Sequence, residues 1–190
     1  MRPVFPLLMA LVLSACGSSA SELSATSGGA ANTASHAYGA GGAPPGKAAV
    51  SANGFGPVRF GMGRPNAERA MGGKFAGPVQ ADACQELIRA DDPDVKYLFL
   101  DGVLQRIDVG TPSVMADGGG RVGMEIGDIR SLYAGRINEG QSSDIPGGHS
   151  LTVANDNGSG IVFQTNGNGL VTAFRAAAAV AIDRAEGCHP

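Results

Sequence analysis

The sequence predicts an α+β fold in which two short helices each precede an antiparallel β-meander. Three observations indicate this fold. A segment with Gly-Met at its second and third positions recurs at an offset of 62 residues, in 60–72 and 122–134. Apolar residues in each copy follow helical spacing, and the downstream segments are strand-like and separated by tight-turn residues. Because a short sheet with one apolar face needs a second layer, we expect the helices to pack on one face.

The chain begins with a leader that precedes any predicted helix or strand of the fold. Residues 1–15 carry one charge, Arg2, followed by an apolar run over 4–12 and small residues at the end. This is the layout of a secretory signal peptide, and the run is far shorter than the roughly 20 residues that span a bilayer. We therefore expect export and removal of 1–15.

The segment Leu13-Ser14-Ala15-Cys16 resembles the lipobox of bacterial lipoproteins. In that family the chain is cut before the cysteine, which then carries a diacylglyceryl group and an N-acyl chain, so the resemblance implies lipidation at Cys16. Several acyl chains anchor a protein stably, whereas one holds it only marginally. An ordinary signal peptide that leaves Cys16 unmodified is the alternative. Gly17 stands where the inner-membrane retention signal has Asp, which favours the outer membrane, on its periplasmic or its surface face.

Residues 16–50 are predicted to be the lipidated cysteine and a flexible linker. Gly, Ala and Ser dominate this segment, and its only acidic or basic charges are Glu22 and Lys47. Such a segment buries too little apolar surface to offset the entropy of ordering it. A coil of this length spans roughly 30–35 Å on average, so it would hold a folded domain, 51–190, away from the membrane. A longer Ala-rich helix is the alternative, which the scattered glycines disfavour.

The composition of 51–190 suits one acidic domain. A chain of this length hides about two-thirds of its unfolded surface when it folds. It holds 12 Lys and Arg against 16 Asp and Glu, a net charge near −4. These charges are interspersed, so the domain offers neither the basic face that nucleic acids need nor a polybasic membrane patch. We expect no nucleic-acid partner and no cofactor, and membrane contact through the lipid anchor.

The first predicted repeat, about 51–117, opens with a helix. Pro65 suits the first turn, and the apolar positions within 67–71 have the i, i+3, i+4 spacing of a buried stripe. Gly72 is expected to end the helix. Strands are predicted over 84–89, 95–100 and 103–109, with a tight turn at Asp101-Gly102 between the last two.

The second predicted repeat, about 118–190, follows the same plan. Gly123 aligns with Gly61, and the apolar positions of 129–133 match those of 67–71. Gly135 is expected to end this helix. The predicted strands are 150–154, 161–165, 170–175 and a last one over 179–184.

Tandem repeats of this kind, each opening with a Gly-Met turn, resemble the BamE/SmpA-type small envelope lipoproteins and the β-lactamase-inhibitor-protein fold. The resemblance covers most of 51–190 and implies a module that binds proteins rather than transforming a substrate. It therefore carries over no catalytic residue. Gly63 and Glu125 depart from the Ser or Thr that usually caps such helices.

Two cysteines lie in the predicted domain, Cys84 and Cys188. In an exported protein an even pair most simply forms one disulfide, which here would tie the C-terminal tail to an early strand. Two free thiols or a nucleophilic cysteine are the alternatives. No C-x-x-C occurs, and pairing would remove the thiolate that a reactive cysteine needs.

Several motifs have structural explanations that we prefer to functional ones. The segment 118–123 satisfies G-x-G-x-x-G but does not follow directly on a parallel strand, so nucleotide binding is not expected. Residues 155–160 resemble half of a calcium loop without its end carboxylates, which favours a turn and leaves only weak ion binding open. The carboxylates of 91–94 are interpreted as a solvated turn, and His149 and His189 as surface residues. We expect no metal site and no catalytic residue.

These observations together predict a membrane-anchored, non-enzymatic envelope lipoprotein that binds or scaffolds an envelope protein or glycan. Inhibition of a secreted or periplasmic hydrolase is the alternative, and an enzyme with an unrecognised site is a third. Protein-binding surfaces favour exposed aromatic and Arg side chains. Tyr97, Arg106 and Tyr133 are the candidate partner-binding residues on this ground.

Overall fold

A computed structural model describes residues 48–77, 83–185 and 187–188. The chain divides into two units, 1–37 and 38–190, and every described residue belongs to the second. The predicted signal peptide, Cys16, nearly all of the predicted linker and His189 lie outside the described residues. No helix within the described ranges is long and apolar enough to cross a membrane.

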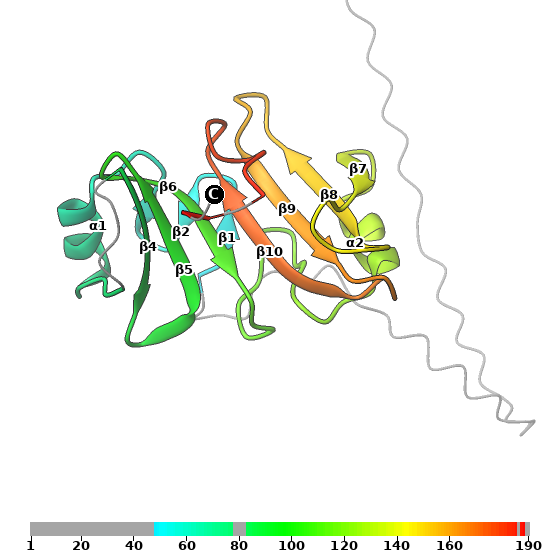
Figure 1. The fold of residues 1–190 in the computed structure, drawn as a ribbon, viewed down its shortest axis with the longest axis horizontal. Coiled ribbons are helices and arrows are strands. Elements are labelled where there is room, and N and C mark those ends of the chain that lie inside the picture. Colours follow the sequence, from blue (N-terminus) through cyan, green and yellow to red (C-terminus); the bar gives the residue numbers. More distant parts are fainter. Residues whose placement is uncertain (1–47, 78–82, 186, 189–190) are drawn as a thin grey trace, which may run out of the picture. The chain divides into compact units, whose positions relative to one another are not determined.

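The described part is an α+β fold dominated by antiparallel sheet, which confirms the predicted class (Figure 1). Its larger sheet has seven strands in the order β4-β5-β6-β10-β9-β8-β7. These strands are β4 (Cys84–Arg89), β5 (Asp92–Leu100), β6 (Val103–Val109), β7 (Ile137–Gln141), β8 (His149–Ala154), β9 (Gly160–Thr165) and β10 (Val171–Ala177). A smaller sheet consists of β1 (Val50–Ser51), β2 (Gly54–Phe55) and β3 (Val58–Arg59).

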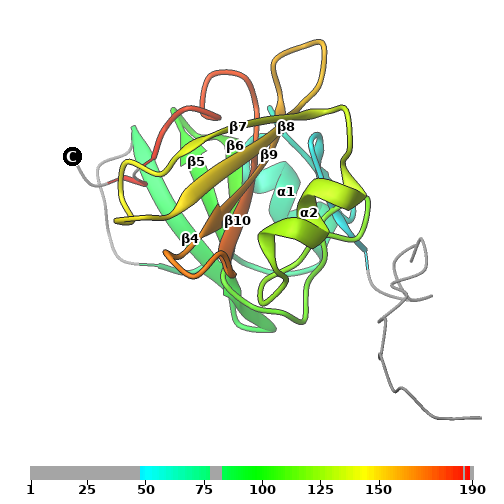
Figure 2. The same cartoon turned by 90° about the vertical axis from the view of Figure 1, so that its right-hand side faces the viewer.

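Two short helices, α1 (Arg64–Met71) and α2 (Ile126–Leu132), lie on the same side of the large sheet (Figure 2). Pro65 occupies the first turn of α1, and Gly72 ends that helix in the left-handed conformation at φ 69°, both as predicted. Ala67 and Ile129, the inward-facing residues of the two helices, are fully buried in one core. Neither helix has a side-chain cap.

The core between the helices and the sheet is built from aromatic side chains on alternate strand positions. Tyr97 and Phe99 of β5 contact Phe75, with ring centroids 4.8 and 5.3 Å apart respectively. In the other half, Phe163 of β9 lies 5.3 Å from the ring of Tyr133. Buried aromatic pairs at these separations contribute about 0.5–1.5 kcal/mol each beyond the area they bury.

The predicted last strand, 179–184, is wrong. These residues form turns after β10, and Ala181 and Ile182 pack with Val162 and Ala177 on the sheet face opposite the helices. The segment covers this face instead of adding to its edge because β10 already pairs with β6 and β9 on both sides. The other predicted strands are present, with bounds that differ from the prediction by at most three residues.

The structure corrects one predicted boundary of the domain and confirms the bond that closes the other. Val50, assigned above to the end of the linker, is fully buried in β1, so the folded part begins before Ser51. The predicted disulfide is present: Cys84, at the start of β4, is bonded to Cys188, with Cα atoms 5.5 Å apart. It attaches the C-terminal tail to the edge strand of the large sheet.

Candidate functional site

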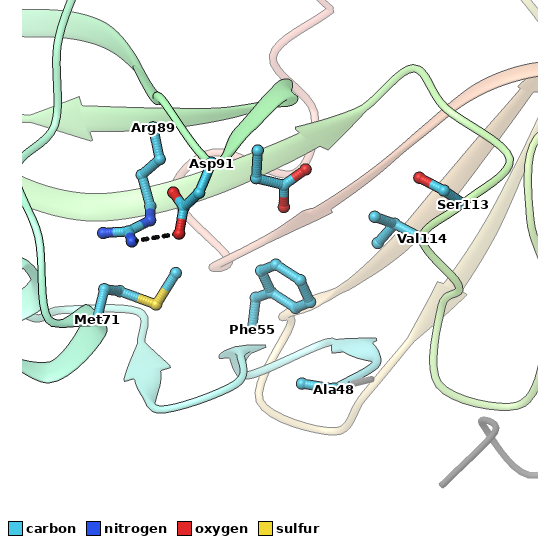
Figure 3. A pocket seen from close by; sticks show the side chains of 8 residues that line it. Ala48, Phe55, Met71, Arg89, Asp91, Ser113 and Val114 are labelled. Atoms are coloured by element: carbon cyan, nitrogen blue, oxygen red, sulfur yellow. Dashed lines mark hydrogen bonds and ion pairs between the residues drawn. The ribbon is translucent and has the colours of Figure 1, made fainter. Parts of the chain in front are cut away.

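A pocket of about 320 Å³ opens where the turn between β4 and β5 faces the small sheet and the end of α1 (Figure 3). This volume lies at the lower end of the roughly 300–1,000 Å³ range of small-molecule sites. Its charged wall consists of Arg89, Asp91 and Asp92. Its other lining residues are Ala48, Phe55, Met71, Ser113 and Val114.

Arg89, at the end of β4, is the most buried charged group of the pocket, with a side chain 8% exposed. Its Nη2 donates a hydrogen bond to Oδ2 of Asp91 at 2.7 Å. Its Nη1 is buried and has no hydrogen-bond partner among the described residues. Gly73 makes room for this guanidinium, because a Cβ at Gly73 would lie only 3.1 Å from Nη1. The pocket thus holds a rigid cation with one donor group still unused.

The carboxylates make this wall acidic despite the arginine. Asp91 is 68% exposed at its side chain, and the Arg89 guanidinium holds the pKa of Asp91 below its usual range. Asp91 therefore stays ionised well below neutral pH and neutralises Arg89. Asp92, the first residue of β5, adds a second carboxylate to the lining. The formal charge of the three groups is negative.

Tyr97 lies behind this wall, on the core side of β5. Its hydroxyl is buried and accepts or donates no hydrogen bond within the described part of the chain. Burial raises the pKa of Tyr97, and the nearby charge of Asp92 adds to this shift, so the phenol stays neutral. A buried hydroxyl without a partner costs about 1–3 kcal/mol. Tyr97 and Arg89 therefore place two unsatisfied polar atoms in one region of the fold.

Apart from Ser113, the side chains of the remaining wall are apolar. Figure 3 shows Met71 and Phe55 facing the Arg89–Asp91 pair across the hollow. Apolar walls beside a few charged groups typify ligand sites, in which the apolar contact supplies affinity and the charges supply orientation.

Residues 91–94, interpreted above as a solvated turn, form a turn only in part. Asp91 is in the turn, but residues 92–94 already belong to β5. Arg89 was not singled out at all. The strand pattern did carry a signal for Arg89. Residues two apart on a strand point to the same face, so Arg89 shares the face of Leu87, and both residues are buried.

The three predicted partner-binding residues are buried, so the prediction that they are exposed is wrong. Tyr97 is 0%, Arg106 3% and Tyr133 1% exposed. Both tyrosines belong to the core between helices and sheet. Arg106 lies on the opposite face, where its Nε donates to Asp108 at 2.8 Å and its Nη1 donates to the carbonyl of Arg184 at 3.0 Å. Aromatic and Arg side chains are common in buried networks as well as in interfaces, so residue type alone did not separate the two.

The remaining motifs are accounted for by the fold. The G-x-G-x-x-G segment packs against aromatic rings, since a Cβ at Gly120 would lie 2.6 Å from the ring of Phe163. In the turn after β8, Oδ1 of Asn157 accepts from the backbone and the hydroxyl of Ser159 at 3.0 and 2.7 Å. His149 pairs with Glu139 at 2.9 Å between Nδ1 and Oε1. Over the described ranges, no group of three or more His, Cys, Asp or Glu side chains is placed to hold a metal ion.

Comparison with known proteins does not assign the chain to a family. No protein-family model and no curated protein matches it. Among solved structures, it is similar to the uncharacterised protein YfeY from Escherichia coli, with a TM-score of 0.45 and 17% identity over 68% of this chain and 99% of that one. It is also similar to an extracellular protein containing an SCP domain from Bacillus anthracis, with a TM-score of 0.44 and 8% identity over 63% of this chain and 44% of that one.

Proposed function

We propose that this chain is a non-enzymatic lipoprotein of the bacterial envelope whose α+β domain binds a basic side chain of an envelope protein in the Arg89 pocket. The observation that carries the binding role is the pocket itself, with an apolar wall of Phe55 and Met71 facing an acidic rim that includes Asp91. The membrane anchor rests on the lipobox-like Leu13–Cys16 segment, which lies outside the described residues.

Charge favours a basic partner over an acidic one. The predicted domain carries a net charge near −4, which attracts cationic surfaces and speeds their encounter. Within the pocket Asp91 is exposed enough to accept a second cation while it remains paired with Arg89. The methylenes of a bound Lys or Arg would cover Phe55 and Met71, at about 25 cal/mol for each Å² of apolar surface buried.

We also propose that the domain arose as a tandem repeat, and the hydrogen bonds before each helix support it. In the first copy, Gly61 N–H donates to Leu104 O at 2.8 Å, and Leu104 N–H donates to Met62 O at 2.9 Å. Arg64, the first residue of α1, donates its N–H to Gly102 O at 3.1 Å. The segment before α1 is thus paired with the start of β6.

The second copy contains the same set of bonds. Gly123 N–H donates to Val171 O at 2.8 Å, and Val171 N–H donates to Met124 O at 2.9 Å. Ile126, the first residue of α2, donates its N–H to Gly169 O at 2.8 Å. Equivalent helix and strand positions thus pair in the same way in both halves. This supports the resemblance to tandem-repeat binding modules of the BamE/SmpA and β-lactamase-inhibitor type.

The binding proposal is tested with the full mature protein and the capped amino acids N-acetyl-lysine amide and N-acetyl-arginine amide. One charge pair with a short apolar stem should give a dissociation constant on the order of 1 mM. We expect saturable NMR shifts at the Met71 methyl group that are lost in the Asp91→Asn, Asp92→Asn double variant. The Asp101→Asn, Asp156→Asn double variant removes the same number of charges from two exposed turns that do not line the pocket, and this charge-matched control should bind normally.

Binding that survives the double variant would overturn the assignment of the pocket. The anchor is tested separately by mass spectrometry of the processed protein and by the Cys16→Ser variant. We expect diacylglyceryl and N-acyl groups on Cys16 and release of the variant from the membrane. An unmodified N-terminus would remove the lipoprotein proposal. Micromolar inhibition of a β-lactamase or lysozyme by the purified protein would instead favour the inhibitor alternative.

A further inference from the structure

A second pocket, of about 200 Å³, lies on the sheet face opposite the helices and is separate from the Arg89 pocket. Its floor includes Ser150 and Thr152 of β8, Gln164 of β9 and Arg175 of β10. Asp144 and Asp183 stand among its exposed lining residues. The C-terminal segment that covers this face of the sheet forms one of its walls.

Arg175 is the unusual residue of this pocket. It is 8% exposed, and burial together with the charge of neighbouring Arg106 lowers its pKa. Across the described residues its guanidinium makes one hydrogen bond, from Nη2 to Ile182 O at a weak 3.4 Å. Its Nε is buried and unpartnered, and no carboxylate oxygen of a described residue lies within 4.0 Å of it. Among the described residues, four of its five N–H donors therefore have no protein partner.

The contrast with Arg106 shows that Arg175 has no ion pair at contact distance among the described residues, although Asp108, Asp144 and Asp183 lie close enough to favour its charge. Arg106 lies on the same face and is about as buried, yet its Nε donates to Asp108 at 2.8 Å and its Nη2 lies 4.0 Å from Glu86. A guanidinium stays protonated in proteins, so burial without an anion is costly. The fold therefore compensates one buried arginine and leaves the other facing a pocket.

The floor of the pocket beside Arg175 consists of polar side chains. The side chains of Ser150, Thr152 and Gln164 are half-buried and make no hydrogen bond to any described residue. Hydroxyl and amide groups can donate to an oxyanion while a guanidinium binds it through two parallel hydrogen bonds. The pocket thus combines the positive charge of Arg175 with neighbouring hydrogen-bond donors in an accessible cavity.

We propose that the Arg175 pocket binds a small carboxylate with a single negative charge. One charge balances one guanidinium, and a planar carboxylate matches the two-pronged geometry of Arg. Asp144 and Asp183 at the rim repel a dianion such as phosphate about twice as strongly as a monoanion, which favours a single negative charge. The hollow is smaller than the roughly 300 Å³ at which drug-sized sites begin, so it takes a head group of a few atoms rather than a large ligand.

The test uses the full mature protein titrated with acetate, glucuronate and inorganic phosphate at constant ionic strength. The Arg175 Nε–H resonance and the thermal midpoint are followed together. We expect saturable binding of both carboxylates, at least tenfold weaker binding of phosphate, and loss of carboxylate binding in Arg175→Gln. Arg184→Gln removes the same charge from an exposed neighbour and should bind as the native protein does.

A second variant keeps the proposal testable if Arg175→Gln does not fold. Thr152→Phe retains the arginine but fills the pocket, and it should abolish binding while leaving the far-ultraviolet spectrum unchanged. The proposal is overturned if no carboxylate binds saturably, if phosphate binds as tightly as acetate, or if Thr152→Phe binds normally. The Arg89 pocket plays no part in these results, so its own assignment stands or falls separately.

Discussion

The two halves of the domain each bury a tyrosine, but they treat its hydroxyl differently. The hydroxyl of Tyr133, after α2, donates to Asp117 O at 2.6 Å and accepts from Gly120 N–H at 3.1 Å. The hydroxyl of Tyr97, on β5, has no partner in the part of the chain that the structure describes. Tyr133 therefore holds the backbone around it in place through these two hydrogen bonds. Tyr97 contributes little to stability beyond the burial of its apolar ring.

The glycines beside Tyr133 also show that the chain is adapted to this side chain. A Cβ at Gly118 would lie 2.6 Å from the Tyr133 ring, and Gly118 also has φ +89°, where side chains are strained. The chain at 118–120 is therefore shaped to receive this tyrosine. Around Tyr97 the polar neighbours are the charges of the Arg89 pocket. We infer that the Tyr133 hydroxyl helps to hold the chain path of its half, whereas the Tyr97 hydroxyl, without a partner among the described residues, lies beside the charged wall of a pocket.

The largest expected effect comes from removing the disulfide, which belongs to the first half through β4. The Cys84→Ala, Cys188→Ala double variant should lose up to about 4.7 kcal/mol, the chain-entropy value for a loop near 100 residues. Urea unfolding measures the loss. Hydrogen exchange should accelerate in β4 and β5 more than in β8 and β9, because only the first pair adjoins the bond. Equal acceleration in both pairs would contradict the separation of the halves.

The next effect is that of Tyr133→Phe. This change leaves the N–H of Gly120 and the carbonyl of Asp117 without their present partner, so we expect a loss of about 1–3 kcal/mol in the free energy of unfolding. Urea denaturation at neutral pH measures it. An unchanged midpoint would show that the two backbone groups find other partners.

Tyr97→Phe should have a much smaller effect. Because the hydroxyl of Tyr97 has no partner to lose within 48–77, 83–185 and 187–188, its removal should change stability by less than about 0.5 kcal/mol or increase it. The same urea experiment, run beside Tyr133→Phe, checks this. A loss of unfolding free energy as large as that of Tyr133→Phe would contradict the distinction between the two tyrosines.

The smallest effect concerns pH. In the first half, Glu68 accepts from Lys74 at 2.7 Å, from Arg64 at 3.1 Å and from the Phe75 N–H at 3.3 Å. The Lys74 hydrogen bond, followed by those of Arg64 and Phe75, holds the pKa of Glu68 below its ordinary 4.5. This stabilisation is present above the unfolded pKa and is lost as pH falls through the folded pKa.

Glu68→Gln should therefore flatten the stability curve below about pH 4.5, as followed by thermal unfolding from pH 7 to 2. Glu139→Gln is the matched variant in the second half, where Arg130 lowers the pKa of a more exposed carboxylate. Its effect should be weaker because solvent screens exposed pairs. The reverse order would show that exposure does not decide the strength of these pairs.

Much of the fold could be predicted because its signals are local. Pro65, Gly72 and the Asp101-Gly102 turn act through the backbone conformations that they allow, and these conformations depend on neighbours only a few residues away. The bounds of β4, β5, β6, β8, β9 and β10 followed from the same kind of pattern, whereas β1, β2, β3 and β7 were not predicted. The segment 179–184 was misassigned because an apolar pair looks alike whether it pairs at an edge or packs on a face.

The sequence by itself determined the α+β class, the order of the main elements, the acidic charge and the pairing of Cys84 with Cys188. Only the tertiary structure decided which polar side chains are buried and which of them have partners. Arg89, Arg106 and Arg175 lie on three strands of the same sheet. Arg89 and Arg106 each pair with an Asp two residues further on, but the carbonyl that Arg106 contacts and the wall of the pocket that Arg175 faces both come from the distant C-terminal segment. Burial depends on what the chain folds over a residue, and local sequence carries little of that information.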